Sequence, residues 1–379
     1  MKTRHFALFG VLSSITLAAN LVRAAAPVVV ADQSSPNPPQ QPQVAIDAGG
    51  LIHLAFGTKA GKAQGGVHYA RSDDGGKTFS PPVHIGTVDG LALGMRRGPR
   101  IAVTQGAICV SVIGHKEGNI LLFRSTDKGK TWDQAATVND QLGSAGEGLH
   151  GMAASSKGEL TCVWLDHRNK ESEVFCSTST DSGKSWSKNT LAYHSPDGDV
   201  CPCCHPSVTY SPDGKIHVLW RNALGGNRDM YHAVSSDGGK TFAKAQKLGA
   251  GTWPLDRCPM DGGSIAVLTN CKPATVWRRD KTVYFFAAGS SQELDLGPGE
   301  QPWITASSKG PIAVWVRKRG ESLLLRLPGA NIKPVELSKA ALDPIVASGG
   351  PKNEIVVAAW EDASNGVKKL VCQRIDMTK

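Results

Sequence analysis

The feature of this sequence that most constrains its fold is a repeated octet. Four octets share the pattern SxDxGx(T/S)(W/F): SDDGGKTF at 72–79, STDKGKTW at 125–132, STDSGKSW at 179–186 and SSDGGKTF at 235–242. Their first residues are 53, 54 and 56 positions apart. Each octet lies between two short strand-like runs, which predicts a hairpin turn. In such a turn the Ser and Asp side chains can bond nearby backbone N–H groups, and the Gly can adopt a positive φ.

A second, longer repeat extends beyond the octets. It consists of a strand phrase, a turn and a β-rich strand that often contains Trp, and it occurs as QPQVAIDAGGLIHLAF, GPRIAVTQGAICVSV, HGMAASSKGELTCVW, HPSVTYSPDGKIHVLW, GGSIAVLTNCKPATVW, QPWITASSKGPIAVW and DPIVASGGPKNEIVVAAW. Fixed-period β units of about 40–57 residues are typical of a propeller. We therefore predict an all-β propeller of four-stranded blades, seven by this count, with six as the alternative. The last unit shows three clear strands, so we expect the strand near 28–30 to pair with the strand around 370–375 and close the ring.

The octets and the strand phrasing resemble the Asp-box (BNR-repeat) β-propellers of the sialidase-like superfamily, over nearly the whole chain after residue 25. A CxCC segment before one blade, followed by RDM and WPL…CPMDGG, is similar to a subtype of secreted bacterial sialidase-like proteins. The resemblance implies a propeller that binds or hydrolyses a glycan, with exo-alpha-sialidase activity as the enzymatic form. Because propellers host many functions, it indicates the fold more strongly than the chemistry.

The N-terminal segment and the net charge of the chain indicate its location and its class of ligand. The chain opens with MKTRH, an apolar run and VRAAA, which predicts a signal peptide over residues 1–25, cleaved near 24–26, and a single domain over 26–379 that is secreted or periplasmic. No later run reaches the roughly 20 apolar residues of a membrane span. The net charge of +9 is dispersed, which favours a carbohydrate or an anionic cell-surface ligand over nucleic acid. We expect a monomer.

The propeller topology assigns candidate residues to two faces. Asp boxes are turns between the third and fourth strands of a blade and define the back face, where Asp74, Asp127, Asp181 and Asp237 are predicted to be structural. The front face collects the starts of the inner strands and the loops between second and third strands, where ligands of such folds bind. The ligand-binding candidates there are Arg97, Arg100, Glu147, His150, Arg221, Arg228, Asp229, Asp261, Arg279, Glu300 and Arg317. The alternative is that most of these are solvated loop residues.

Sialidases bind a substrate carboxylate with three arginines and attack with a tyrosine. The segment GPRIA resembles the RIP element of that family, so Arg100 is the candidate for one arginine, with Arg221 or Arg228, Arg279 and Arg317 for the others. Of the five tyrosines, Tyr193 alone lies in a predicted loop, and none resembles the late-chain tyrosine of the family. The catalytic residues are therefore unknown, and enzymatic activity is an open question.

The stretch DVCPCCHPS at 199–207 concentrates three cysteines before the fourth inner strand, and Cys258 precedes the fifth. We expect Cys201, Cys203, Cys204 and Cys258 to lie together on the front face. They permit a disulfide to Cys258, or a Cu or Zn site completed by His205 or Met260. Haem c attachment at the formal CxxCH match lacks a surrounding helical domain. Three functions follow: a glycan-binding or glycan-cleaving propeller, a metal-binding or redox propeller, and a non-catalytic interaction scaffold with disulfide-stapled loops.

Overall fold

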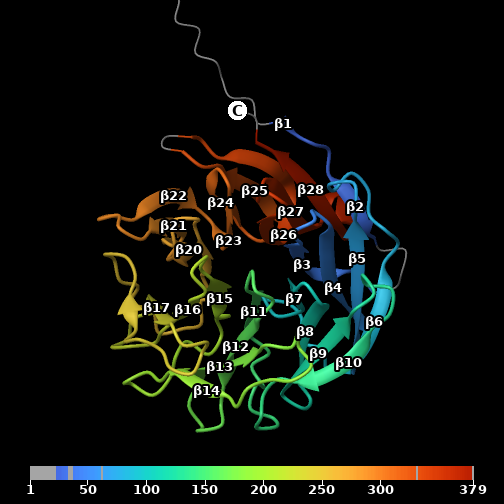
Figure 1. The fold of residues 1–379 in the computed structure, drawn as a ribbon. Helices are drawn as coiled ribbons and strands as arrows, with labels where there is room; N and C mark the ends of the chain where they lie inside the picture. The colour runs from blue at the N-terminus through green and yellow to red at the C-terminus, as the bar shows by residue number, and fades with distance from the viewer. Residues whose placement is uncertain (1–22, 33–36, 61–62, 330–331, 378–379) are drawn as a thin grey trace, which may run out of the picture.

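The computed structural model describes residues 23–32, 37–60, 63–329 and 332–377, so most of the predicted signal peptide lies outside the described residues. Within these ranges the chain is all-β, apart from one short 3-10 helix, η1 (Ser364–Gly366). Figure 1 shows the sheets arranged as blades around a central axis. None of the helical segments in the described ranges has the length and apolar character that crossing a membrane requires.

Five of the blades are separate four-stranded antiparallel sheets. Blade 1 consists of β3 (Gln40–Ile46), β4 (Ile52–Ala60), β5 (Gln64–Ser72) and β6 (Val83–Asp89). Blade 2 consists of β7 (Arg100–Val103), β8 (Ile108–Gly114), β9 (Asn119–Ser125) and β10 (Asp133–Thr137). Blade 3 consists of β11 (His150–Ala154), β12 (Leu160–Asp166), β13 (Glu173–Ser179) and β14 (Thr190–Tyr193). Blade 4 consists of β15 (Ser207–Tyr210), β16 (Ile216–Arg221), β17 (Met230–Ser235) and β18 (Gln246–Lys247). Blade 5 consists of β19 (Ser264–Val267), β20 (Pro273–Arg279), β21 (Thr282–Ala287) and β22 (Leu294–Pro298).

Blades 6 and 7 are joined into one eight-stranded sheet by the long strand β26 (Val335–Gly349). Its first part pairs with β25 (Glu321–Arg326) as the outer strand of blade 6, which begins with β23 (Glu300–Ser307) and β24 (Gly310–Val316). Its second part pairs with β27 (Ile355–Asp362) as the inner strand of blade 7, followed by β28 (Lys369–Asp376). The count of seven blades is confirmed, and the alternative of six is wrong.

The N-terminal strands close the ring, as the sequence predicts. β2 (Val28–Ala31) pairs with β28 through Val28↔Cys372 and Val29↔Val371, and β1 (Arg23–Ala24) continues the same edge. The inner strands β3, β7, β11, β15, β19, β23 and β26 contact one another in order, and β26 returns to β3. An apolar core that contains Val30, Leu54 and Leu370 joins the N-terminal strand to blades 1 and 7. Closure thus buries apolar surface that an open blade 7 would expose to water.

The cores between blades are built from the second strands together with the first and third strands beside them. The largest fully buried side chains include a tryptophan near the end of this strand in four blades: Trp164, Trp220, Trp315 and Trp360. Four cysteines behave as small hydrophobes in these cores, as expected: Cys109, Cys162, Cys176 and Cys372. A channel of about 560 Å³ follows the axis and is bordered by the inner strands and by the turns after them, such as the one at Asp47.

All four Asp boxes are turns between the third and fourth strands on the back face. In the second box the Ser125 hydroxyl donates to Asp127 at 2.8 Å, and the Thr131 hydroxyl donates to the same carboxylate at 2.6 Å. The hydrogen bond from Thr131 lowers the pKa of Asp127. Ser125 pairs with Ile108, at the opposite end of blade 2 from Arg100, so the predicted separation of the two faces is confirmed.

Candidate functional site

The front end of the axis is closed by buried polar side chains from the starts of the inner strands. They form what we call the axial polar cluster: Arg96, Arg100, His150, His205, Asp261, Gln301 and Asp343, each at most 4% exposed. Three of the predicted site residues, Arg100, His150 and Asp261, are among these buried side chains. Because these side chains are buried, they hold the front loops together rather than face solvent.

Arg96 is a buried member of this cluster, although only its sequence neighbours Arg97 and Arg100 were predicted as ligand-binding residues. It comes from the loop between blades 1 and 2, and its guanidinium donates to the carbonyl oxygens of Pro344, at 2.8 Å, and Gln301. The same group lies 5.4 Å from the ring centre of Trp303. Arg96 therefore connects blade 2 to blades 6 and 7 across the axis. The sequence feature that could have indicated a role for Arg96 is the segment GMRRGPR, which contains three arginines.

Two carboxyl groups near the axis have raised pKa values because they are buried. Burial raises the pKa of Asp261 to about 6, and its Oδ2 accepts a hydrogen bond from the Gln301 backbone N–H at 2.8 Å. Burial and the nearby charge of Asp343 raise the pKa of Glu361 to about 7, and its Oε1 accepts from the Gln41 N–H at 2.9 Å. Asp261 was a predicted site residue, whereas Glu361 was not.

Several polar atoms of the axial polar cluster have no hydrogen-bond partner among the described residues. They are both ring nitrogens of His205, Nδ1 of His150, Oδ1 of Asp261 and the Nε atoms of Arg96 and Arg100. His205 stacks on Trp303, with ring centres 5.7 Å apart and an interplanar angle of 17°. Buried polar atoms of folded proteins are usually hydrogen-bonded, so the cluster has donor and acceptor capacity that the protein itself does not use.

Two of the candidate arginines, Arg100 and Arg221, are engaged in holding backbone carbonyls, which corrects the expectation that they bind a substrate carboxylate. Arg221 is 1% exposed and donates to the carbonyl oxygens of Arg228, Asp261 and Arg278 at 2.7–3.2 Å. Arg100 donates to the carbonyls of its own turn, including Pro99 at 2.9 Å. The physical reason is that loop carbonyls converge at the front of the ring, and a buried guanidinium can satisfy several of them at once.

The remaining candidates form pairs on or near the front loops. Arg97 pairs with Glu147 at 3.6 Å, Arg279 pairs with Glu293 at 2.6 Å, and Glu300 accepts from Arg278 at 3.0 Å. Asp229 accepts from the Trp253 N–H at 2.9 Å, and the Arg228 N–H donates to the Trp253 carbonyl at 2.8 Å. Arg317 is exposed. Most of these side chains therefore position loops.

Tyr193 is not in a loop, which corrects the sequence-based expectation. It ends strand β14 and pairs with Val174. Its hydroxyl accepts from the Asn222 amide at 2.9 Å, and its ring packs against Trp220 with centres 4.6 Å apart. Burial raises its pKa, and these contacts pack the tyrosine between blades 3 and 4.

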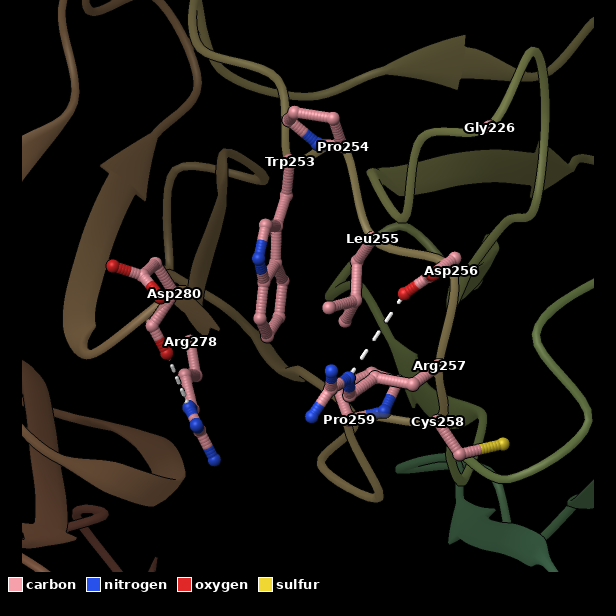
Figure 2. Close-up of a pocket in the computed structure, with 10 residues that line it drawn as sticks. All are labelled: Gly226, Trp253, Pro254, Leu255, Asp256, Arg257, Cys258, Pro259, Arg278 and Asp280. Atoms are coloured by element: carbon pink, nitrogen blue, oxygen red, sulfur yellow. Dashed lines mark hydrogen bonds and ion pairs between the residues drawn. The ribbon is translucent and has the colours of Figure 1, made fainter.

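An accessible cavity of about 670 Å³ lies beside the axis, between the front loops of blades 4 and 5. We call it the Trp253 pocket, and it is lined by Gly226, Trp253, Pro254, Leu255, Asp256, Arg257, Cys258, Pro259, Arg278 and Asp280. Figure 2 shows the Trp253 indole beside Arg278, with the Arg257 side chain reaching from its loop toward them. The Arg257 side chain is 82% exposed. The pocket is thus bordered by the Trp253 indole, which is 8% exposed, and by two guanidinium groups, one from the 253–259 loop and one from the end of β20.

The cysteines of the front face separate into a cluster and a single residue. The cysteine cluster, Cys201, Cys203 and Cys204, is buried, with sulfur atoms 3.4–4.0 Å apart, and Met260 packs against it. Hydrogen bonds with Cys203 and Cys204, together with the charges of Arg221 and Arg228, lower the pKa of Cys201 to about 4. Cys258 is a free, exposed thiol, and Figure 2 shows it pointing away from Trp253. This corrects the expected disulfide to Cys258, since its loop extends toward solvent while the cluster faces inward.

A ring of β blades with four Asp-box turns of one shared pattern on its back face defines an Asp-box β-propeller. The chain belongs to the BNR repeat-like domain family, which matches residues 23–201 and, in a second match, residues 108–292. The predicted resemblance to sialidase-like propellers is thereby confirmed.

Solved structures with the same fold are distant in sequence. A protein of unknown function from Dyadobacter fermentans is 16% identical, with 93% of this chain and 98% of that chain covered and a TM-score of 0.56. An alpha-L-arabinanase of Penicillium chrysogenum, complexed with arabinobiose, is 16% identical, with 92% and 98% covered and a TM-score of 0.54. An alpha-L-arabinofuranosidase of Fusarium graminearum, also with arabinobiose, is 14% identical, with 93% and 97% covered and a TM-score of 0.53. At these identities the likeness concerns the fold alone.

Proposed function

We propose that the protein is an exported carbohydrate-binding propeller that holds a glycan bearing an anionic group in the Trp253 pocket. The observation that carries this proposal is the pocket itself. Its volume of about 670 Å³ lies within the range of about 300–1,000 Å³ typical of ligand sites. An aromatic ring can pack against the apolar face of a sugar, and guanidinium groups pair with carboxylates or sulfates.

Three further observations support this class of ligand. The pocket lies on the front face, where the loops of neighbouring blades meet. The net charge of +9 favours anionic ligands. The arabinanase and the arabinofuranosidase with the same fold were solved with a carbohydrate bound.

Binding is better supported than hydrolysis. Hydrolysis of a glycosidic bond ordinarily needs two carboxyl groups on either side of it, one of them with a raised pKa. The two carboxyl groups with raised pKa values, Asp261 and Glu361, are at most 4% exposed, and neither lines the pocket. No tyrosine lines it either. We therefore propose a binding function without turnover.

The test is a binding panel of neutral and anionic oligosaccharides, including arabinobiose, sialyllactose, oligogalacturonate and a sulfated glycan, followed by calorimetry at two salt concentrations. We expect an anionic member to bind, with an affinity that falls as salt rises. Arg257→Ala should weaken binding about tenfold, the equivalent of one charge-assisted hydrogen bond. This variant is well suited to the test because the Arg257 side chain is largely exposed, so its removal leaves the fold intact.

The matched control is Arg317→Ala, which removes an exposed arginine that does not line the pocket. It should leave binding unchanged. The absence of binding to every oligosaccharide, or equal affinities of the wild-type protein and both the Arg257→Ala and Arg278→Ala variants, would overturn the proposal. Chromatography of the same mixtures tests turnover, and release of a shorter sugar would overturn the assignment as a non-catalytic binder.

A further inference from the structure

Three thiols converge on one point in the front loop of blade 4, outside the Trp253 pocket. Cys201, Cys203 and Cys204 are 0%, 6% and 1% exposed. Their sulfur atoms all lie within 4.8 Å of one another. Within the described residues they are the one group of three or more His, Cys, Asp or Glu side chains whose ligand atoms all come this close to one another.

The local backbone explains why the three sulfur atoms meet. The Cys201 N–H donates to the Arg221 carbonyl at 3.0 Å, which anchors the start of the loop to the end of β16. The Cys204 N–H donates back to the Cys201 carbonyl at 3.4 Å, so the chain turns between these two residues. The turn brings Cys203 and Cys204 against Cys201, and all three side chains face inward.

The sulfur separations suit ligands of a single soft metal ion. Sulfur atoms bound at about 2.3 Å around a tetrahedral ion lie about 3.8 Å from one another. The observed separations of 3.6 Å for Cys201–Cys203, 3.4 Å for Cys201–Cys204 and 4.0 Å for Cys203–Cys204 bracket this value. A disulfide, at about 2.05 Å, would require any pair to move more than 1 Å closer.

A fourth sulfur atom is available from a different loop. Met260 packs against the cysteine cluster from the segment that leads into blade 5. His205, the alternative ligand from the sequence, is stacked on Trp303 and does not belong to the group of converging ligand atoms. Zinc sites use Cys, His and carboxylate ligands, whereas a thioether with thiolates favours Cu(I).

We propose that Cys201, Cys203, Cys204 and Met260 form a buried copper(I) site. In the complex all three cysteines are thiolates, and three thiolates with one Cu(I) ion carry two net negative charges. Arg221 lies beside the cluster and is 1% exposed; within the described ranges it donates only to carbonyl oxygens and forms no ion pair with a carboxylate. Its charge, together with that of Arg228, would offset the complex, which a buried site requires.

The test uses the reduced protein under anaerobic conditions, titrated with Cu(I) against a chromogenic copper(I) chelator. We expect one Cu(I) per chain, a near-ultraviolet thiolate-to-copper absorption band, and sulfur neighbours alone at about 2.3 Å in X-ray absorption. Cys203→Ser and Cys201→Ser should each lower the affinity about 100-fold or more, since they remove a direct ligand. Circular dichroism verifies that each variant folds.

Two further variants make the test specific. Met260→Leu keeps the apolar volume, so we expect about a tenfold loss of affinity and one fewer sulfur neighbour. Cys258→Ser is the matched control, because it removes a thiol outside the cluster, and it should bind copper like the wild-type protein. Failure to retain Cu(I) against the chelator, tighter retention of Zn(II) than of Cu(I), or an equal loss in Cys258→Ser and Cys203→Ser would overturn the site. Glycan binding by the Cys201→Ser, Cys203→Ser and Met260→Leu variants should be unchanged, because none of these residues lines the Trp253 pocket, so the two proposals fail independently.

Discussion

Replacing Arg221 with methionine tests whether the buried arginines of the front face are structural. The guanidinium makes four hydrogen bonds to three carbonyl oxygens, those of Arg228, Asp261 and Arg278. Each buried carbonyl left without a donor costs about 1–3 kcal/mol. Some of that cost is recovered where water enters from the exposed loops, and methionine keeps most of the aliphatic volume. We therefore expect a loss of about 3–6 kcal/mol in the free energy of unfolding.

The assay is urea unfolding followed by tryptophan fluorescence. Arg221→Lys is the informative control: it keeps the charge but cannot span three carbonyls, so its loss should be intermediate. A loss below about 1 kcal/mol for Arg221→Met would refute the structural role, because that is the effect of an ordinary surface change. Loss of glycan binding without loss of stability would instead identify Arg221 as a ligand-binding arginine.

Three further predictions concern the Asp boxes, the front carboxyl groups and the ring closure. Asp127→Asn should lower the thermal midpoint at neutral pH without changing glycan binding. Because hydrogen bonds from Thr131 lower the pKa of Asp127, the difference from the wild-type protein should shrink as the pH falls below about 4 and disappear only below the lowered pKa of the folded state. A difference that stays constant from neutral pH into acid would contradict the prediction. Burial raises the pKa of Glu361 from 4.5 to about 7, so between these pH values the folded state holds a proton that the unfolded chain releases. The free energy of unfolding should therefore fall as the pH rises from about 4.5 to 7. Glu361→Gln should flatten that fall in a pH series of urea midpoints. Truncation through Ala31 removes β2, which pairs with β28, and should lower the thermal midpoint markedly. Truncation through Ala26 keeps β2 and should not lower it. Equal midpoints of the two truncated proteins would show that ring closure adds little to stability.

The sequence by itself determined the architecture of this protein. The octets carry their own hydrogen-bonding partners within a few residues, as Ser125, Asp127 and Thr131 do, so the turn they form is a local property. The spacing of the octets and of the tryptophan-containing strands then sets the blade period, and with it the two faces. For the same reason the closing pair of strands was predictable, since the last unit lacked one strand and the N-terminus supplied an apolar one.

Only the tertiary structure decided what the front-face residues do. Arg100 and Arg221 are of the residue type that binds carboxylates, and only the fold shows that backbone carbonyls occupy their donors. The donors of Arg100 bond its own turn, and those of Arg221 reach the Arg278 carbonyl of blade 5. Cys258 and the cysteine cluster precede consecutive inner strands, which suggested a bridge, but whether a loop folds inward or toward solvent depends on contacts far along the chain. Met260 meets the cysteine cluster because blades 4 and 5 pack together, a contact that spans more than 50 residues of sequence. Long-range packing, which leaves no local pattern, therefore selects which of the candidate side chains are available to a ligand.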